Sequence, residues 1–561
     1  MAAHAGSPPL GRVAHISAWS RVYGFGSIYG KTIRDSRLAF IIVTGILVAM
    51  MIAAGAAMKS VFPTPESRKE VDTLISSIPS SLTGLFGNPI KVDTLGGVVN
   101  WKYGPFFALG AGLWSILALS STLAGEAVRG SLDIVAASPF GRRRIALEKL
   151  AAHLTMMVLS MSILALTSSL TAAVYGDASL GDSIPPLNAI GFALWVGLTA
   201  LAAGGVAFAL APVIGRGGSA GIAGAVMVGG YVANGYLADV PGVGILADFS
   251  WFHWTAGQAP IVGVFDWPAL ALVAVVVIVM LGLGVELFAR RDLGVTTAIP
   301  APALPDAALG VRGPISRSFG DLLPRALAWG IGLGLMGLLV ASLTGTFAGE
   351  LAKQPSFESL LKAMFRDYDI TSAGGLLQAY AQMLFVVAGL AGATFVAKWA
   401  SDEGDRRLEM VLTTPLARAW WAISGGIGGA LAAVAMTILF AAGIGIGAAS
   451  AGTEFVGPME GSAALGLYAV AVVGVGVAIG GLWRTSLAAE LASLFVIATF
   501  LVDLLVPALS WPDWIHQLAL TAHLGQPMVG KWDPVGIAAC LLVAGGGLAL
   551  GAWGMTRRDI G

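Results

Sequence analysis

The sequence predicts an all-α polytopic membrane protein, and three features support this fold class. Hydrophobic residues make up 56% of the 561 residues and charged residues only 11%, against about 25% charged residues in soluble domains. Apolar runs of roughly 20 residues, the length that crosses a bilayer as a helix, recur along the chain. The 76 glycines favour close packing of helices in lipid. We therefore expect the bilayer to surround most of the protein.

Twelve apolar runs predict twelve membrane spans in two groups of six. The first group is Leu38–Met58, Gly104–Ala124, Leu154–Val174, Ile190–Ala211, Ala220–Leu237 and Pro268–Phe288. The second group is Ala326–Thr346, Leu377–Trp399, Trp421–Ala448, Gly461–Gly481, Ser486–Val506 and Val535–Met555. The expected organisation is a cytoplasmic tail with an amphipathic helix (1–37), a six-span unit (38–294), a Pro-rich cytoplasmic linker (295–325) and a second six-span unit (326–561).

The distribution of basic residues predicts that both termini are cytoplasmic. In this orientation 23 of the 32 Lys and Arg residues fall on cytoplasmic segments, as expected because cytoplasmic loops of membrane proteins are enriched in Lys and Arg.

The two halves share short sequence patterns in the same order. Residues 132–142 and 408–418 both read Leu, an acid, two residues ending in Val, two further residues, and then Ser/Thr-Pro-x-x-Arg. The halves also end alike, at 290–294 and 557–561, and each has a Phe-Gly pair before its first span. Because six is an even number, both copies start on the same side of the membrane. The sequence therefore predicts a parallel internal repeat, which is typical of transporters.

A rigid cytoplasmic corner is predicted between the second and third span of each unit. Residues 126–137 carry Val128, Leu132 and Val135 at helical spacing, which predicts a short amphipathic helix at the membrane face. Ser138 could cap the next helix, with Pro139 at its first position, where the missing N–H costs nothing. The same device recurs over residues 403–415. Such a rigid corner could transmit movement from a cytoplasmic partner to the third span. The arginines taken alone are explained more simply as part of an ordinary basic cytoplasmic loop.

Two six-span units with this corner resemble ABC-2-type permeases, and in particular the fused permeases of actinobacterial exporters of polyketide antibiotics and other drugs. The resemblance implies that the loop after each second span is a coupling helix seated on a nucleotide-binding subunit. In the first unit the implied coupling residues are Glu126, Arg129, Asp133, Ser138, Pro139 and Arg142. In the second unit they are Glu403, Asp405, Glu409, Thr414, Pro415 and Arg418.

The resemblance further implies a multi-pass protein of the bacterial cytoplasmic membrane that moves amphiphilic drugs, antibiotics or lipids outward. The expected partners are two copies of an ATPase subunit, membrane lipid and an amphiphilic small molecule, with ATP and Mg²⁺ bound by the partner. The chain itself is expected to be no enzyme and to hold no cofactor. Its nearest approach to a phosphate-binding loop, residues 26–32, has three residues between its glycines, whereas a P-loop needs four.

A proton-coupled secondary carrier of the major-facilitator type is the alternative. Gly130 and Asp133, followed by the cluster from Gly141 to Arg144, are similar to the loop motif of that class, but the two parts of the motif are too widely separated here. A third alternative is an assembly factor of the membrane that transports nothing. The zero formal net charge indicates no nucleic-acid partner.

Few polar groups fall inside the predicted spans. We expect Glu286 to pair with Arg290 and Glu490 to reach Arg484, since long basic side chains extend to the interface. Asp503 and Asn234 lie in the outer parts of equivalent spans, and they are candidate pathway residues or, equally, partners in an outer hydrogen bond. The single cysteine excludes a disulfide framework, and the histidines near the outer ends lack the companions of a metal site.

Overall fold

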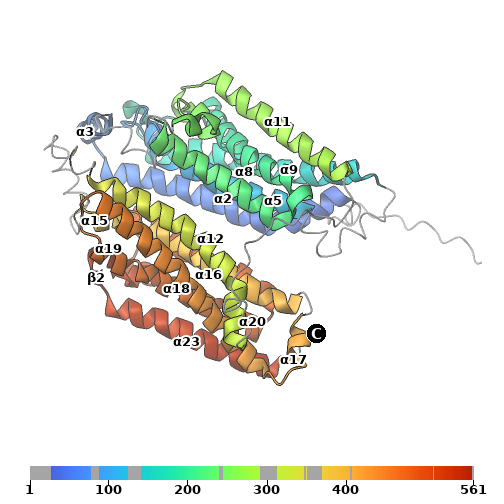
Figure 1. Cartoon of the computed structure of the whole chain (residues 1–561). Helices are drawn as coiled ribbons and strands as arrows, with labels where there is room; N and C mark the ends of the chain where they lie inside the picture. The colour runs from blue at the N-terminus through green and yellow to red at the C-terminus, as the bar shows by residue number, and fades with distance from the viewer. Residues whose placement is uncertain are drawn as a thin grey trace, which may run out of the picture. The chain divides into compact units, whose positions relative to one another are not determined.

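The computed structural model describes residues 27–76, 87–123, 140–238, 244–290, 313–345, 349, 369, 371–404, 407–509 and 511–558. These residues form two compact units, 1–300 and 301–561, which Figure 1 shows in blue to green and in yellow to red. Each unit is a bundle of long helices, and each is described by itself below.

The first unit contains six long helices, with short helices at one end of the bundle. The long helices are α2 (Ile28–Val61), α5 (Gly104–Thr122), α8 (Arg142–Tyr175), α9 (Pro186–Val232) and α11 (Trp267–Arg290), with α9 counted as two arms for the reason given below. The short elements are α3 (Pro65–Ser76), α4 (Leu95–Val98), η2 (Val99–Tyr103), η3 (Ala178–Leu180), η4 (Ala233–Leu237), η5 (Gly244–Phe249), α10 (Trp251–Trp254) and η6 (Pro260–Val262).

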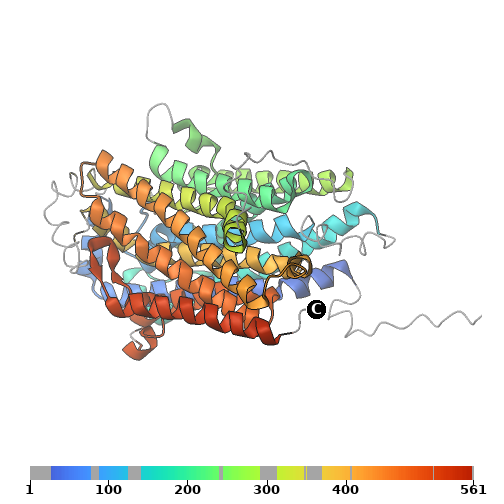
Figure 2. The same cartoon turned by 60° about the horizontal axis from the view of Figure 1, so that its bottom comes forward.

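The second unit is built from a similar series of helices. The long ones are α12 (Pro314–Ser342), α16 (Ala381–Gly404), α18 (Arg418–Ser450), α20 (Ala463–Leu482), α21 (Thr485–Ala508) and α23 (Pro534–Arg557). The short elements are α15 (Ala373–Ala379), α17 (Arg407–Leu412), α19 (Val456–Gly461), α22 (Asp513–His516), η8 (Leu520–His523), β1 (Gly525–Gln526), η9 (Pro527–Val529) and β2 (Lys531–Trp532). In Figure 2 the hairpin of β1 and β2 lies at the end of α23 opposite the chain's C terminus.

The prediction of an all-α polytopic membrane protein is confirmed. Within the described residues, eleven helices are long and apolar enough to cross a membrane. Twelve spans were predicted, and the difference lies in one stretch, Pro186–Gly235, which contains both the fourth and the fifth predicted span.

This stretch is a helical hairpin rather than one straight rod. A straight helix of its length would extend about 75 Å, more than twice the bilayer core of about 30 Å. Gly215 interrupts the helix with φ 77° and ψ 176°. A Cβ atom placed on Gly112 of α5 would collide with Met227 and lie 3.8 Å from Ala200 Cα. Since Met227 and Ala200 flank Gly215 and meet the same point of α5, the chain folds back at Gly215.

The second unit reaches the same arrangement with two separate helices. A Cβ atom on Gly389 of α16 would lie 2.8 Å from Tyr468 of α20 and 2.7 Å from Val496 of α21. The chain turns between these helices at Trp483 and Arg484. In each unit, therefore, a glycine of the second span lets the fourth and fifth spans approach it closely.

The segments ahead of each first span differ from the prediction. A separate amphipathic helix was expected over Phe25–Arg37, but α2 runs unbroken from Ile28 into the span. In the second unit, α12 likewise runs from Pro314 through Pro324 into the apolar segment. In α12 the helix continues through Gly320 and Pro324 without a break.

Candidate functional site

The predicted corner of the second unit lies between α17 and α18. The Thr413 hydroxyl donates to the carbonyl of Met410 at 2.7 Å, and the Thr414 hydroxyl donates to the carbonyl of Val411 at 2.5 Å. The threonines therefore close the C-terminal end of α17. The prediction that the proline occupies the first position of the next helix is wrong, because α18 begins at Arg418, with Ala417 as its cap. Pro415 lies three residues earlier, in an exposed turn.

In the first unit the third-span helix also begins at the arginine. Helix α8 starts at Arg142 with Gly141 as its cap, so Pro139 is not its first residue either. Glu126, Arg129, Asp133, Ser138, Pro139 and Asp405 lie outside the described residues, and their coupling role stays a prediction.

The two predicted coupling glutamates of the second unit have different surroundings. Glu403 at the end of α16 is an ion-pair partner of Arg558 and accepts a hydrogen bond from the Thr485 hydroxyl at 2.7 Å. Its side chain is only 21% exposed. Glu409 is exposed on α17. Of the two, Glu409 is available to a partner protein, whereas Glu403 holds parts of its own unit together.

Arg558 is the centre of this contact network. Besides Glu403, its guanidinium donates to the carbonyl of Trp483 at 3.2 Å, and its own carbonyl accepts a hydrogen bond from Arg418 at 3.1 Å. Arg558 thus connects the C-terminal end of α23, the turn between α20 and α21, the end of α16 and the start of α18. In Figure 1 these segments lie at the end of the unit marked by α17 and the C terminus.

The basic start of α8 is paired with α11 in the first unit. Glu286 forms the expected ion pair with Arg290, and it also pairs with Arg143 at 2.7 Å. The predicted pairing of Glu286 with Arg290 is confirmed, whereas the second ion pair, with Arg143, was not indicated by the sequence. The predicted contact of Glu490 with Arg484 is not present among the ion pairs of the described residues, and both side chains are exposed.

The candidate pathway residues are both bonded to histidines that follow their own span. The Asn234 carboxamide oxygen lies 3.2 Å from His253 Nδ1. The buried carboxylate of Asp503 lies 3.2 Å from His516 Nε2 and accepts a hydrogen bond from the Thr521 hydroxyl. The short elements α22 and η8 bring these two polar groups back to Asp503, a contact that its surroundings in the sequence did not indicate. A pathway role for either residue stays a prediction.

The outer segments of the two units have the same local conformation. Before its last span, each unit has a Gln followed closely by Pro, a short 3-10 turn, and a glycine with positive φ, Gly263 at 83° and Gly530 at 76°. Backbone pairing closes both turns, at Ala259–Val264 and at β1–β2.

A second short element packs on each of these turns. Thr94 and Ser372 cap short helices by accepting a hydrogen bond from the glycine amide three residues on. The next amide side chain then contacts the turn: Asn100 donates to the Gln258 carbonyl at 3.1 Å, and Gln378 accepts from the Met528 amide at 3.2 Å. These matched elements were missed in the sequence, although Thr/Ser-x-Gly-Gly occurs at both positions.

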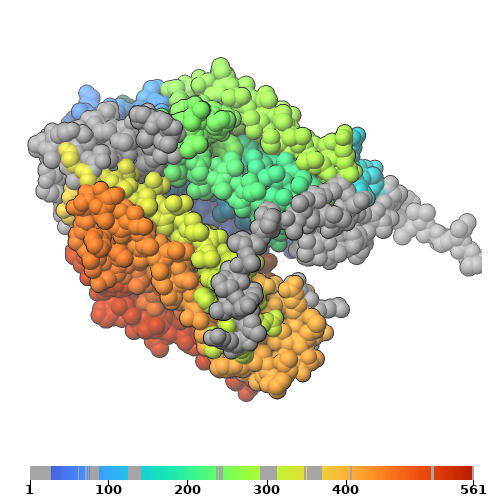
Figure 3. Space-filling model, in the orientation of Figure 1, coloured from blue at the N-terminus to red at the C-terminus, as the bar shows by residue number. Residues whose placement is uncertain are grey.

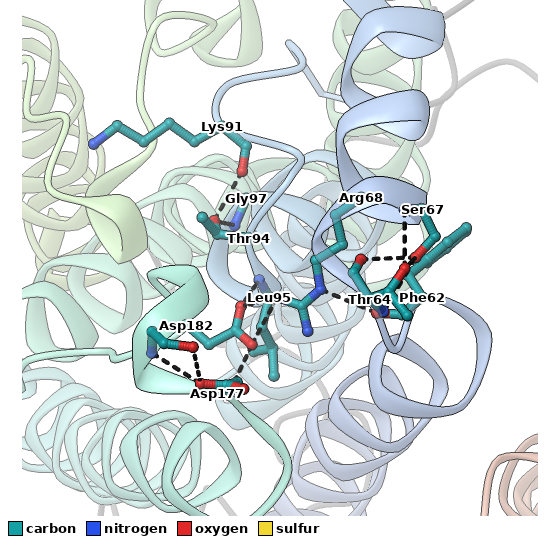
Figure 4. Close-up of polar contacts among 11 residues, drawn as sticks. Phe62, Thr64, Ser67, Arg68, Lys91, Thr94, Leu95, Gly97, Asp177 and Asp182 are labelled. Carbon is teal, nitrogen blue, oxygen red and sulfur yellow. Dashed lines mark hydrogen bonds and ion pairs between the residues drawn. The ribbon is translucent and has the colours of Figure 1, made fainter.

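A buried ion pair in the first unit was also missed. Arg68 of α3 lies 2.8 Å from both carboxylate oxygens of Asp182, and its Nε donates to the Phe62 carbonyl at 3.0 Å. Asp182 also accepts hydrogen bonds from the amides of Leu95 and Asp177. Figure 4 shows these groups converging from separate segments. Arg68 and Asp182 are 114 residues apart, so only the fold brings them together.

The described structure defines a polytopic helical membrane protein with charged corners at one end of a bundle and aromatic, tightly turned segments at the other. Residues 323–556 match the family described as the C-terminal domain of the multidrug efflux system permease Rv1217c. The match covers most of the second unit, and it supports a transporter permease. No curated protein sequence matches the chain.

Proposed function

We propose that this chain is the membrane-spanning permease of an ATP-binding-cassette exporter that moves amphiphilic drugs, antibiotics or lipids outward. A separate ATPase subunit, in two copies, would bind ATP and Mg²⁺ and supply the energy. The chain would provide both transmembrane halves of the exporter in the bacterial cytoplasmic membrane.

One observation carries this proposal, namely the match of residues 323–556 to a domain of a multidrug efflux permease. A proton-coupled carrier of the major-facilitator type is not favoured by this match. The matched family is a C-terminal domain, and the matched residues lie in the second, C-terminal unit of this chain.

The contacts at the corner of the second unit support different roles for Glu409 and Glu403 within the proposed coupling site. Glu409 lies exposed on α17, next to the turn that leads into α18. Glu403 and Arg418 both contact Arg558. A force applied to α17 by an ATPase would therefore reach α16, α18 and α23 through this network. Glu409 would make the contact with the partner, and Glu403 would keep the receiving helices connected.

The test is to co-express the chain with a candidate ATPase and to measure co-purification, ATP hydrolysis and ATP-dependent export of an amphiphilic dye from cells. Glu409→Lys should weaken ATPase binding at least tenfold, about 1.4 kcal/mol, and should leave the thermal stability of the purified chain unchanged. Glu403→Gln should lower stability by about 1–3 kcal/mol because it leaves the buried side of Arg558 without its charged partner.

Glu460→Lys is the matched control, since Glu460 is also exposed but lies on α19 at the other end of the unit. It should affect neither ATPase binding nor export. Dye export by the purified chain alone, driven by a pH gradient without ATP, would overturn the proposal in favour of the secondary carrier.

A further inference from the structure

A small pocket opens at the charged end of the second unit. It has a volume of about 50 Å³ and lies among the start of α12, the end of α16 and the turn between α17 and α18. Four charged side chains line it, Arg317, Asp321, Lys398 and Asp402, together with Trp399 and Trp421. In Figure 3 the surfaces of α12 and of α16–α17 meet at this end of the unit.

The four charges are poorly satisfied by each other. Arg317 and Asp402 are 4.0 Å apart, at the outer limit of an ion pair. Within the described residues, the side chains of these four residues make no hydrogen bond. The Asp402 side chain is only 15% exposed, and a charge that is largely withdrawn from water is costly unless it is hydrogen-bonded. With respect to the described residues, the pocket therefore offers donors and acceptors to a ligand that carries both signs of charge.

The size of the pocket restricts what can enter it. A single water needs about 10–15 Å³ on this measure, so 50 Å³ accommodates a charged group of a few atoms. Pockets for drug-sized molecules have about 300–1,000 Å³. A whole drug-sized molecule is therefore too large for this site, whereas one polar headgroup fits.

The position of the pocket points to a lipid. It lies where the apolar helix α16 ends and the apolar helix α18 begins, the level at which a membrane helix meets the lipid headgroups. The buried Trp399 and Trp421 stack in its wall with ring centroids 4.6 Å apart. Farther along α18, Val434 and Ile438 are exposed apolar side chains, so apolar surface for acyl chains is present on the same helix.

We propose that this pocket binds the headgroup of a zwitterionic phospholipid with a primary amine. Its phosphate would lie against Arg317 and Lys398, and its ammonium group would donate to Asp321 and Asp402. Such a lipid would connect α12 with the turn beside α17. Because lipid binding is measured on the chain alone, this inference does not depend on the proposed function, and either can fail without the other.

The experiment is native mass spectrometry of the purified full-length chain, titrated with single lipids. Phosphatidylethanolamine should bind at least about tenfold more tightly than phosphatidylglycerol, which lacks the amine, and than phosphatidylcholine, whose ammonium group cannot donate a hydrogen bond. Free phosphoethanolamine separates the headgroup from the acyl chains, and it should compete only at much higher concentration. Asp402→Asn and Arg317→Gln should each remove most of the preference for phosphatidylethanolamine.

Arg484→Gln and Glu490→Gln are the matched controls, because both residues are exposed charges on the neighbouring α20–α21 segment, and both variants should keep the preference. Equal binding of phosphatidylethanolamine and phosphatidylglycerol to the unmodified chain would overturn the inference, even if the pocket variants fail to fold. An unchanged preference in folded Asp402→Asn and Arg317→Gln variants would overturn it as well.

Discussion

At the scale of single residues, one buried ion pair and one exposed ion pair have very different surroundings. Arg68 and Asp182 are almost completely buried and share donors and acceptors on all sides. Arg34 and Asp35 form an ion pair in which both side chains are about one third to one half exposed. Water screens the second pair, whereas the first has no water to replace a lost partner. The two pairs should therefore respond very differently to the removal of one charge.

We expect Arg68→Met to destabilise the first unit by about 3–5 kcal/mol, because it leaves the Asp182 carboxylate buried without a counter-charge. Arg34→Met is the control and should cost about 0–1 kcal/mol. Reversible unfolding in mixed detergent, with limited proteolysis of residues 65–100 as a local probe, measures both effects. Equal and small losses of unfolding free energy in the two variants would contradict a buried ion pair between Arg68 and Asp182.

At the scale of elements, backbone conformation decides how many spans the first unit contains. Residues 186–235 form one largely apolar stretch that is helical on both sides of Gly215, so the direction of the chain changes where a residue leaves helical geometry. Gly215 does so with φ 77° and ψ 176°, in a region that is essentially restricted to glycine. The equivalent turn of the second unit is made at Trp483 and Arg484 without a residue of this kind.

Gly215→Ala should therefore destabilise the first unit by about 1–3 kcal/mol, since alanine is strained in this conformation. Gly221→Ala is the control, because that glycine is helical and a Cβ there would meet open space. The control should be neutral or stabilising by up to about 1 kcal/mol. Folded yield and the unfolding midpoint of the purified chain measure the difference. A neutral Gly215→Ala variant would show that the turn is not held at this residue.

At the scale of the whole molecule, the orientation in the membrane determines which end would face the proposed ATPase partner. The sequence predicts that the turn before α18 is cytoplasmic and that the loop between α8 and α9 is outside. Cys540 is the only cysteine of the chain, and it is buried. This makes single-cysteine labelling a direct measurement of orientation.

In a Cys540→Ala background, Ala178→Cys and Ala417→Cys introduce cysteines at exposed positions of these two turns. A membrane-impermeant maleimide should label the residue-178 variant in intact cells, and it should label the residue-417 variant only after lysis. The opposite pattern would place the termini outside and would remove the basis for a cytoplasmic partner at α17.

For most residues of the candidate site, the sequence predicted which residues matter but not which residues they contact. The pairing of Glu286 with Arg290 was predictable because the two residues are one helical turn apart. The contact of Glu403 with Arg558 was not, because 155 residues separate them. The similar ends of the two halves, at 290–294 and 557–561, were visible in the sequence. The structure adds that Arg558, in the second copy, contacts Glu403, Trp483 and Arg418. The corner threonines were misassigned because a hydroxyl beside a proline can close the preceding helix as well as cap the next one.

The sequence by itself determined the class of the protein, the approximate positions of its apolar helices and its division into halves. These follow from composition and periodicity, since lipid requires long apolar helices whatever they pack against. Only the tertiary structure decided that the turn between the fourth and fifth predicted spans lies at Gly215, that Asp503 meets His516, and that Arg68 and Asp182 share one buried site. Such contacts depend on side chains far apart in the chain, which come together only when the helices have packed and the loops have closed over their ends.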